Sequence, residues 1–153
     1  MKIRTVSYSN RRKGFEVVTK ISSYWFPYAR LMSPVPPGES VVHCDVDEEL
    51  GREGFCYRLS SGDEGAVHLD AVLEYNRDPG HVRTMMLHKL TVVARERIDL
   101  AGLSRREVIR RLSTSPAQLY RLLDPTNYRK SVDQMVALLT VLDCEVELVV
   151  SSR

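Results

Sequence analysis

The spacing of apolar residues changes abruptly near Asp78-Pro79-Gly80, and this change constrains the fold more than any other feature of the chain. Before this point, short apolar runs alternate with polar residues, as half-buried strands do. After it, the apolar residues recur at the three- and four-residue steps of a helix, at Met85, Met86, Leu90, Val93, Ala94 and Ile98. The sequence therefore predicts an α+β chain with a β-rich domain over residues 1–80 and a helical domain over residues 81–153.

The N-terminal part contains several runs that are rich in β-branched and aromatic residues. We expect strands at Ile3–Tyr8, Phe15–Ile21, Val41–Val46, Phe55–Leu59 and Ala66–Leu69. The composition of residues 60–65 predicts a hairpin turn, and the three prolines of residues 33–38 predict a surface loop. These elements predict a small antiparallel β-rich domain.

Composition narrows the class of protein. The chain is 43% hydrophobic and 27% charged, as expected of a soluble globular protein. No apolar run approaches the roughly 20 residues of a membrane span, and the first residues lack the apolar stretch of a secretory signal. We therefore expect a cytoplasmic protein with no membrane partner. Cys44, Cys56 and Cys144 are too scattered for a zinc site, so no metal or other cofactor is expected.

The net charge of +2 conceals an uneven distribution. Seven basic residues fall between Arg105 and Lys130, where the only acidic residues are Glu107 and Asp124. Local basic patches of this kind attract phosphates.

Residues 103–124 predict two short helices joined by a polar turn. Ser104 is a good N-cap, and Glu107 is placed to complete a capping box with it. Ser115 followed by Pro116 predicts the start of a second helix. Two helices this short, joined by about three residues, must cross steeply to share one core, which is the layout of a helix-turn-helix.

The outward face of the second helix is suited to reading DNA. At about 100° per residue, Ala117, Tyr120, Arg121 and Asp124 cluster opposite the leucines. Arginine can make a bidentate contact to guanine, and a small residue can touch the methyl group of thymine. Pro116 and Gln118 flank this face.

The loop after the second helix, residues 125–130, has a composition suited to phosphates. It contributes Thr126, Asn127, Tyr128, Arg129 and Lys130. Ser131 is expected to cap a further helix, and the alternating run of residues 144–150 predicts a C-terminal strand.

This segment resembles the lambda-repressor-like (Cro-type) helix-turn-helix family over about residues 83–142. The usual apolar positions of the family fall on Val108, Leu112, Leu119 and Leu122. Ile109 stands where the family usually has alanine, and Ser113 stands where it usually has glycine. The resemblance implies base contacts from Pro116, Ala117 and Arg121, and phosphate contacts from Arg105, Ser115 and the 126–130 loop. With its β-rich N-terminal domain, the layout also resembles a small group of uncharacterised bacterial proteins.

From these features we expect sequence-specific binding of double-stranded DNA by a homodimeric transcriptional regulator, and no enzymatic activity. One such motif reads few base pairs, so a two-fold dimer is expected, with the terminal strand Glu145–Val150 as a candidate contact.

Other interpretations remain open. The chain could be an antitoxin-type interaction module whose N-terminal domain masks a toxin and which also represses its own gene. A large buried pocket in the β-rich domain would favour a ligand-responsive regulator. Residues 104–123 could also form a plain helical hairpin.

Overall fold

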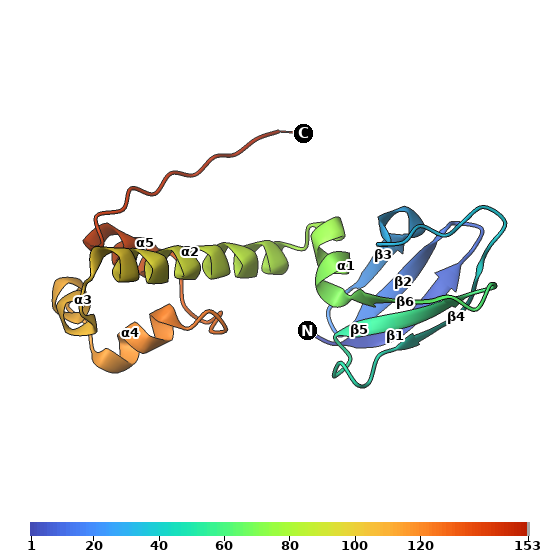
Figure 1. Cartoon of the computed structure of the whole chain (residues 1–153), viewed down its shortest axis with the longest axis horizontal. Coiled ribbons are helices and arrows are strands. Elements are labelled where there is room, and N and C mark those ends of the chain that lie inside the picture. The colour runs from blue at the N-terminus through green and yellow to red at the C-terminus, as the bar shows by residue number, and fades with distance from the viewer. Residues whose placement is uncertain (153) are drawn as a thin grey trace. The chain divides into compact units, whose positions relative to one another are not determined.

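The computed structural model describes residues 1–152 and has an α+β fold (Figure 1). The chain divides into two compact units, Met1–His81 and Val82–Arg153. The division falls next to residue 80, where the sequence predicts the boundary. We describe each unit separately.

The first unit contains two three-stranded antiparallel sheets. One sheet has the order β1 (Ile3–Ser9), β2 (Gly14–Thr19) and β3 (Ser23–Pro27), and the other has β4 (Val41–Val46), β5 (Gly54–Leu59) and β6 (Glu64–His68). A 3-10 helix, η1 (Tyr28–Arg30), follows β3, and the helix α1 (Leu69–Asn76) follows β6. The five expected strands are present, whereas β3 and α1 were not anticipated.

The two central strands, β2 and β5, each begin with a Gly-Phe pair. Phe15 and Phe55 are fully buried, and their ring centroids lie 4.9 Å apart at the centre of the core. Gly14 cannot carry a side chain, because a Cβ atom there would lie 2.3 Å from the ring of Trp25. Buried side chains from both sheets and from α1 belong to one hydrophobic core, which contains this phenylalanine pair.

The second unit is helical, with α2 (Pro79–Ala101) beginning just before the division. It continues with α3 (Arg105–Leu112), α4 (Pro116–Leu123) and α5 (Val132–Val141). Figure 1 shows α3, α4 and α5 gathered along one end of α2. The fully buried core residues are Leu87, Ala94, Val108, Leu119, Met135 and Leu138, supported by Ile98, Leu122, Leu123, Leu139 and Leu142.

Only part of the apolar pattern of α2 lies in this core. Ala94 and Ile98 are buried, but Met85, Met86 and Val93 are exposed. The true core face follows Leu87 instead. The single periodic series read from the sequence is thus a mixture of two faces of the helix.

Four of the helices end at a residue in the left-handed conformation. These residues are Arg77 (φ 51°), Gly102 (φ 61°), Ser113 (φ 53°) and Asp143 (φ 58°), which follow α1, α2, α3 and α5. At the end of α3, for example, the amides of Ser113 and Thr114 donate to the carbonyls of Arg110 and Ile109, both at 3.2 Å. This is the bonding of a Schellman turn, which glycine usually supplies. Only α2 ends on a glycine.

The three predicted serine N-caps are confirmed. The hydroxyl oxygens of Ser104, Ser115 and Ser131 accept hydrogen bonds from the amides of Glu107, Gln118 and Gln134. The capping box expected at Ser104 is wrong, because the Glu107 carboxylate bonds Arg110 and Arg111 instead. A complete box occurs at Ser131, where Gln134 returns the bond.

The predicted C-terminal strand is also wrong. Within the described residues, 144–150 form no strand, and Leu148, Val149 and Val150 are 78–85% exposed. None of the described residues from Val82 onward lies in a strand, so the alternating side chains have no neighbouring strand with which to pair within this unit.

The left-handed turn after α3 generates a stability prediction. Ser113→Gly removes the Cβ atom that disfavours positive φ, so we expect the free energy of unfolding of the second unit to rise by about 0.5–1 kcal/mol. Urea unfolding followed by far-ultraviolet circular dichroism measures this change. Fluorescence of Trp25, the only tryptophan of the chain, reports the first unit and should not change.

Ser113→Ala is the matched control, because alanine keeps the Cβ atom. It should change the free energy of unfolding by less than about 0.5 kcal/mol. Equal stabilisation by alanine and glycine would show that backbone strain at Ser113 is not the cause.

Candidate nucleic-acid interface

The helix α4 has one buried face and one exposed face. Leu119, Leu122 and Leu123 are at most 6% exposed and hold the helix in the core. On the other side of the helix, Ala117 and Arg121 are exposed and Tyr120 is 63% exposed. Asp124, the fourth residue that the sequence assigns to this outward face, is also exposed, so the structure brings all four together.

The beginning of α4 lies beside this face. Ser115 caps the helix and is itself exposed, Pro116 occupies the first helical position, and Gln118 is half-buried. The positive end of a helix dipole and the free amides of its first turn favour a negatively charged group at this end.

The loop that follows α4 is braced by its own side chains. The amide and the hydroxyl of Thr126 donate to the Asp124 carboxylate at 2.9 and 2.7 Å, which lowers the pKa of Asp124. The Asn127 side chain donates to the carbonyl of Arg121 at 3.0 Å and accepts from the amide of Arg129 at 3.1 Å. Thr126 and Asn127 thus shape the loop, and the side chain of Arg129 remains exposed.

A second anchor of the loop was missed by sequence reasoning. The guanidinium of Arg83 in α2 donates to the backbone carbonyls of Tyr128 and Lys130, both at 2.9 Å. Tyr128 is consequently fixed through its backbone while its side chain is 40% exposed. Nothing in the spacing of Arg83 signals this role, because the contact joins residues more than forty positions apart.

The position of Lys130 contradicts the prediction that its side chain contacts a DNA phosphate. It is 4% exposed, and its ammonium donates to the Thr91 hydroxyl at 2.6 Å and to the carbonyls of Leu122 and Asp124 at 2.7 and 2.8 Å. The three acceptors use all three ammonium protons. Burial lowers the pKa of Lys130, and the nearby Asp124 opposes this shift. Because its ammonium is inside the unit, Lys130 cannot contact a phosphate.

One residue in the sequence, Thr91, does indicate that a polar group is buried next to α2. Thr91 is the one fully buried polar residue on the core face of α2, where Leu87 and Ala94 flank it. Its hydroxyl donates a hydrogen bond to the Leu87 carbonyl at 2.7 Å, so its oxygen is left to accept a hydrogen bond from Lys130. A threonine within an apolar stripe predicts a buried polar partner.

The local basic charge is smaller than the sequence indicates. The Glu107 carboxylate accepts from Arg110 at 2.6 Å and from Arg111 at 2.9 Å, and these bonds lower the pKa of Glu107 to about 2. With Lys130 buried as well, the exposed cations of the stretch that form no ion pair within residues 1–152 are Arg105, Arg106, Arg121 and Arg129. Arg105 lies at the first turn of α3.

Arg121 and Arg129 both line an open, mainly polar groove of about 680 Å³ between α4 and the loop. The other residues that line it are Gln118, Leu122, Asp124, Asn127, Lys130 and Gln134. The groove therefore carries two exposed cations and three side-chain amides beside the carboxylate of Asp124, and the cations and amides can contact both phosphates and base edges.

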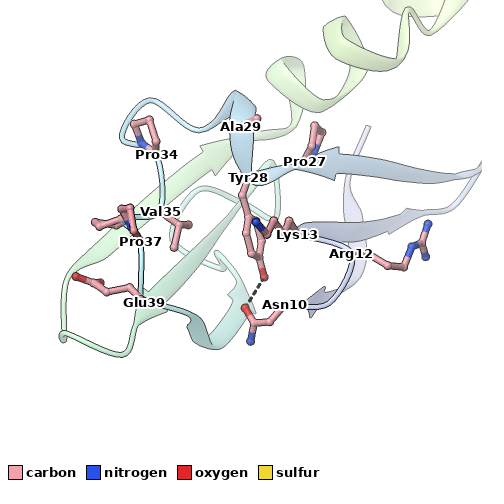
Figure 2. Close-up of a pocket in the computed structure, with 12 residues that line it drawn as sticks. Asn10, Arg12, Lys13, Pro27, Tyr28, Ala29, Pro34, Val35, Pro37 and Glu39 are labelled. Atoms are coloured by element: carbon pink, nitrogen blue, oxygen red, sulfur yellow. Dashed lines mark hydrogen bonds between the residues drawn. The ribbon is translucent and has the colours of Figure 1, made fainter.

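The first unit has a hollow of about 690 Å³ beside its proline-rich loop (Figure 2). Figure 2 shows Tyr28 at its centre, with the hydroxyl donating to Asn10 at 3.0 Å. Burial raises the pKa of Tyr28 to about 12. The Asn10 side chain is also bonded to the backbone of Val41. The central polar groups of this hollow are thus used within the protein, and the hollow is open, unlike the enclosed sites typical of small ligands.

Among residues 1–152, no group of three or more histidine, cysteine, aspartate or glutamate side chains is arranged to hold a metal ion. No helix in this part of the chain combines the length and the apolar character needed to cross a membrane.

Comparison with known proteins adds no relative: the chain matches no family model, no curated protein and no solved structure. The assignment of function therefore rests on the side chains described above.

The burial of its ammonium predicts that Lys130 contributes more to the stability of the second unit than the neighbouring Arg129 does. Lys130→Met keeps the length of the side chain but leaves the carbonyls of Leu122 and Asp124 without their donor. We expect the free energy of unfolding of the second unit to fall by about 1–3 kcal/mol, measured by urea unfolding with circular dichroism detection.

Arg129→Met is the matched control, since it removes the same charge from the adjacent, exposed position. It should change the free energy of unfolding by less than about 0.5 kcal/mol. If Lys130→Met were equally harmless, the ammonium would not be part of the folded core.

Proposed function

We propose that the chain binds double-stranded DNA sequence-specifically, with α3 and α4 acting as a helix-turn-helix and α4 entering the major groove. The observation that carries this proposal is the exposed face of α4, where Ala117, Tyr120 and Arg121 lie opposite three buried leucines. A short helix held by its core face and free on the other is the element that such proteins insert into the groove.

The base contacts are assigned by side-chain chemistry. Arg121 is exposed, and no ion pair within residues 1–152 holds its guanidinium, so it is free for a bidentate contact to guanine O6 and N7. Ala117 is suited to the methyl group of thymine. Pro116 and Gln118 flank these positions, and Tyr120 supplies a further exposed hydroxyl on the same face.

The phosphate contacts are assigned to exposed groups on both sides of α4. Arg105 and Ser115 lie at the beginnings of α3 and α4, and Tyr128 and Arg129 lie in the loop after α4. Thr126 and Asn127 support these contacts by holding the loop against the end of α4. Phosphate contacts set the register of the helix, while base contacts give the specificity.

A protein that recognises a short DNA sequence is suited to act as a transcriptional regulator. Because one motif reads only a few base pairs, we propose that two copies act together on two half-sites.

Selection of bound sequences from random duplex DNA tests the role of Arg121. The wild-type chain should enrich a motif, and Arg121→Ala should lose the preference at one position, at a cost of roughly 1–3 kcal/mol for the best site. Arg106→Ala is the control, because this exposed arginine lies on α3 rather than on the outward face of α4. No enriched motif for the wild-type chain at moderate salt would refute the proposal.

Arg129 should behave differently from Arg121. A phosphate contact carries no sequence information, so Arg129→Ala should weaken binding of the selected site and of unrelated DNA by a similar factor. The slope of the logarithm of affinity against the logarithm of salt concentration should fall by about 1. A loss confined to the selected site would instead place Arg129 among the base contacts.

A further inference from the structure

The helix α2 has apolar side chains on two separate faces. One face follows Leu87, Ala94 and Ile98 into the core of the second unit. The other is turned roughly 130° around the helix axis and is exposed. Its apolar members are Val82, Met86, Val93 and Leu100, which are 46%, 38%, 43% and 82% exposed. An ordinary surface helix has polar residues outside its core face, so this second face needs an explanation.

The exposed positions follow the repeat of a coiled-coil seam. We define the outer stripe as Val82, Met86, Lys89, Val93, Glu96 and Leu100, which are all exposed. The steps between them alternate between four and three residues, which is the spacing of a and d positions in successive heptads. With α2 about 34 Å long, the stripe extends over most of the helix.

The charges of the outer stripe indicate which partner packs against it. The side chains three and four positions from Lys89 are all methionine or valine, and those around Glu96 are valine, leucine or aspartate. Within residues 1–152 neither charge has an ion-pair partner. The stripe thus carries one unpaired cation and one unpaired anion, which complement each other only between two copies of the helix.

The direction of pairing follows from the same charges. Parallel helices in register would place Lys89 beside Lys89 and Glu96 beside Glu96, which is unfavourable. Antiparallel helices related by a two-fold axis at the level of residues 92–93 bring each Lys89 to the level of Glu96 of the partner subunit. The same axis brings Leu100 to within one residue of the level of Met86 of the partner subunit, which matches apolar groups of the stripe at both ends.

We propose that the outer stripe of α2 is a homodimer interface on which a second copy of the chain docks in antiparallel orientation. The C-terminal residues 144–150 fit the stripe less well, because their only charges are those of Glu145 and Glu147, which can pair with Lys89 but leave Glu96 without a cation. This interface supplies the two-fold pairing that the proposed DNA binding requires. It does not rest on DNA binding, since it is measured on the free protein.

Charge reversal tests the interface. Sedimentation equilibrium of the full chain should give a dimer at micromolar concentration. Lys89→Glu and Glu96→Lys should each raise the dimer dissociation constant by roughly 10- to 100-fold, because each places like charges together. The double variant Lys89→Glu/Glu96→Lys should restore association, which a general loss of folding could not do. Unchanged circular dichroism confirms that these exposed substitutions leave the helices intact.

The opposing outcomes are distinct. A wild-type chain that is monomeric at these concentrations, or single variants that remain fully dimeric, would overturn the interface. Deletion of residues 144–153 separates the two possible contacts: continued dimerisation supports α2, and a monomer would assign the contact to the C-terminal segment instead. A monomer that still selects a DNA motif would refute the interface and leave the proposed DNA binding standing, whereas a dimer that selects none would refute the DNA binding and leave the interface standing.

Discussion

The arrangement of the helical unit depends on the buried ammonium of Lys130. Its three N–H groups donate hydrogen bonds to the Thr91 hydroxyl in α2, to the Leu122 carbonyl in the last turn of α4 and to the Asp124 carbonyl just after α4. Helix ends leave several carbonyl groups without partners, and here a lysine from the following loop satisfies two of them. The same residue immediately precedes the N-cap of α5. One charged group therefore fixes where α4 ends, how the loop returns and where α5 begins.

This arrangement explains why the candidate site is well formed although it consists of short helices and a loop. The outward face of α4 is positioned from behind by leucines, and its far end is held by Lys130 and Asn127. Arg83 anchors the loop to α2 from the other side. The exposed arginines therefore project from a braced support, which is what precise recognition of a groove requires.

The sequence predicts local features well and distant contacts poorly. Serine caps and the proline at the start of α4 were predictable, because their signals lie within four residues of each other. The left-handed endings at Arg77, Ser113 and Asp143 were not, because the usual signal is a glycine. Lys130 was assigned to the surface since a lysine in a polar loop normally lies there. In α2, overlapping core and outer stripes gave a single apolar series, so periodicity alone could not separate them.

Because α2 is apolar on two faces, the stability of the helical unit should depend on the concentration of the protein. In the proposed dimer α2 supplies both the core of its own unit and the contact with the second copy. Ligands that bind only the folded state stabilise it in proportion to the logarithm of their concentration, and here the ligand is another copy of the chain. The thermal midpoint of the helical unit would then rise with protein concentration. The amount of protein in the cell would set the fraction that is folded as well as the fraction that is paired.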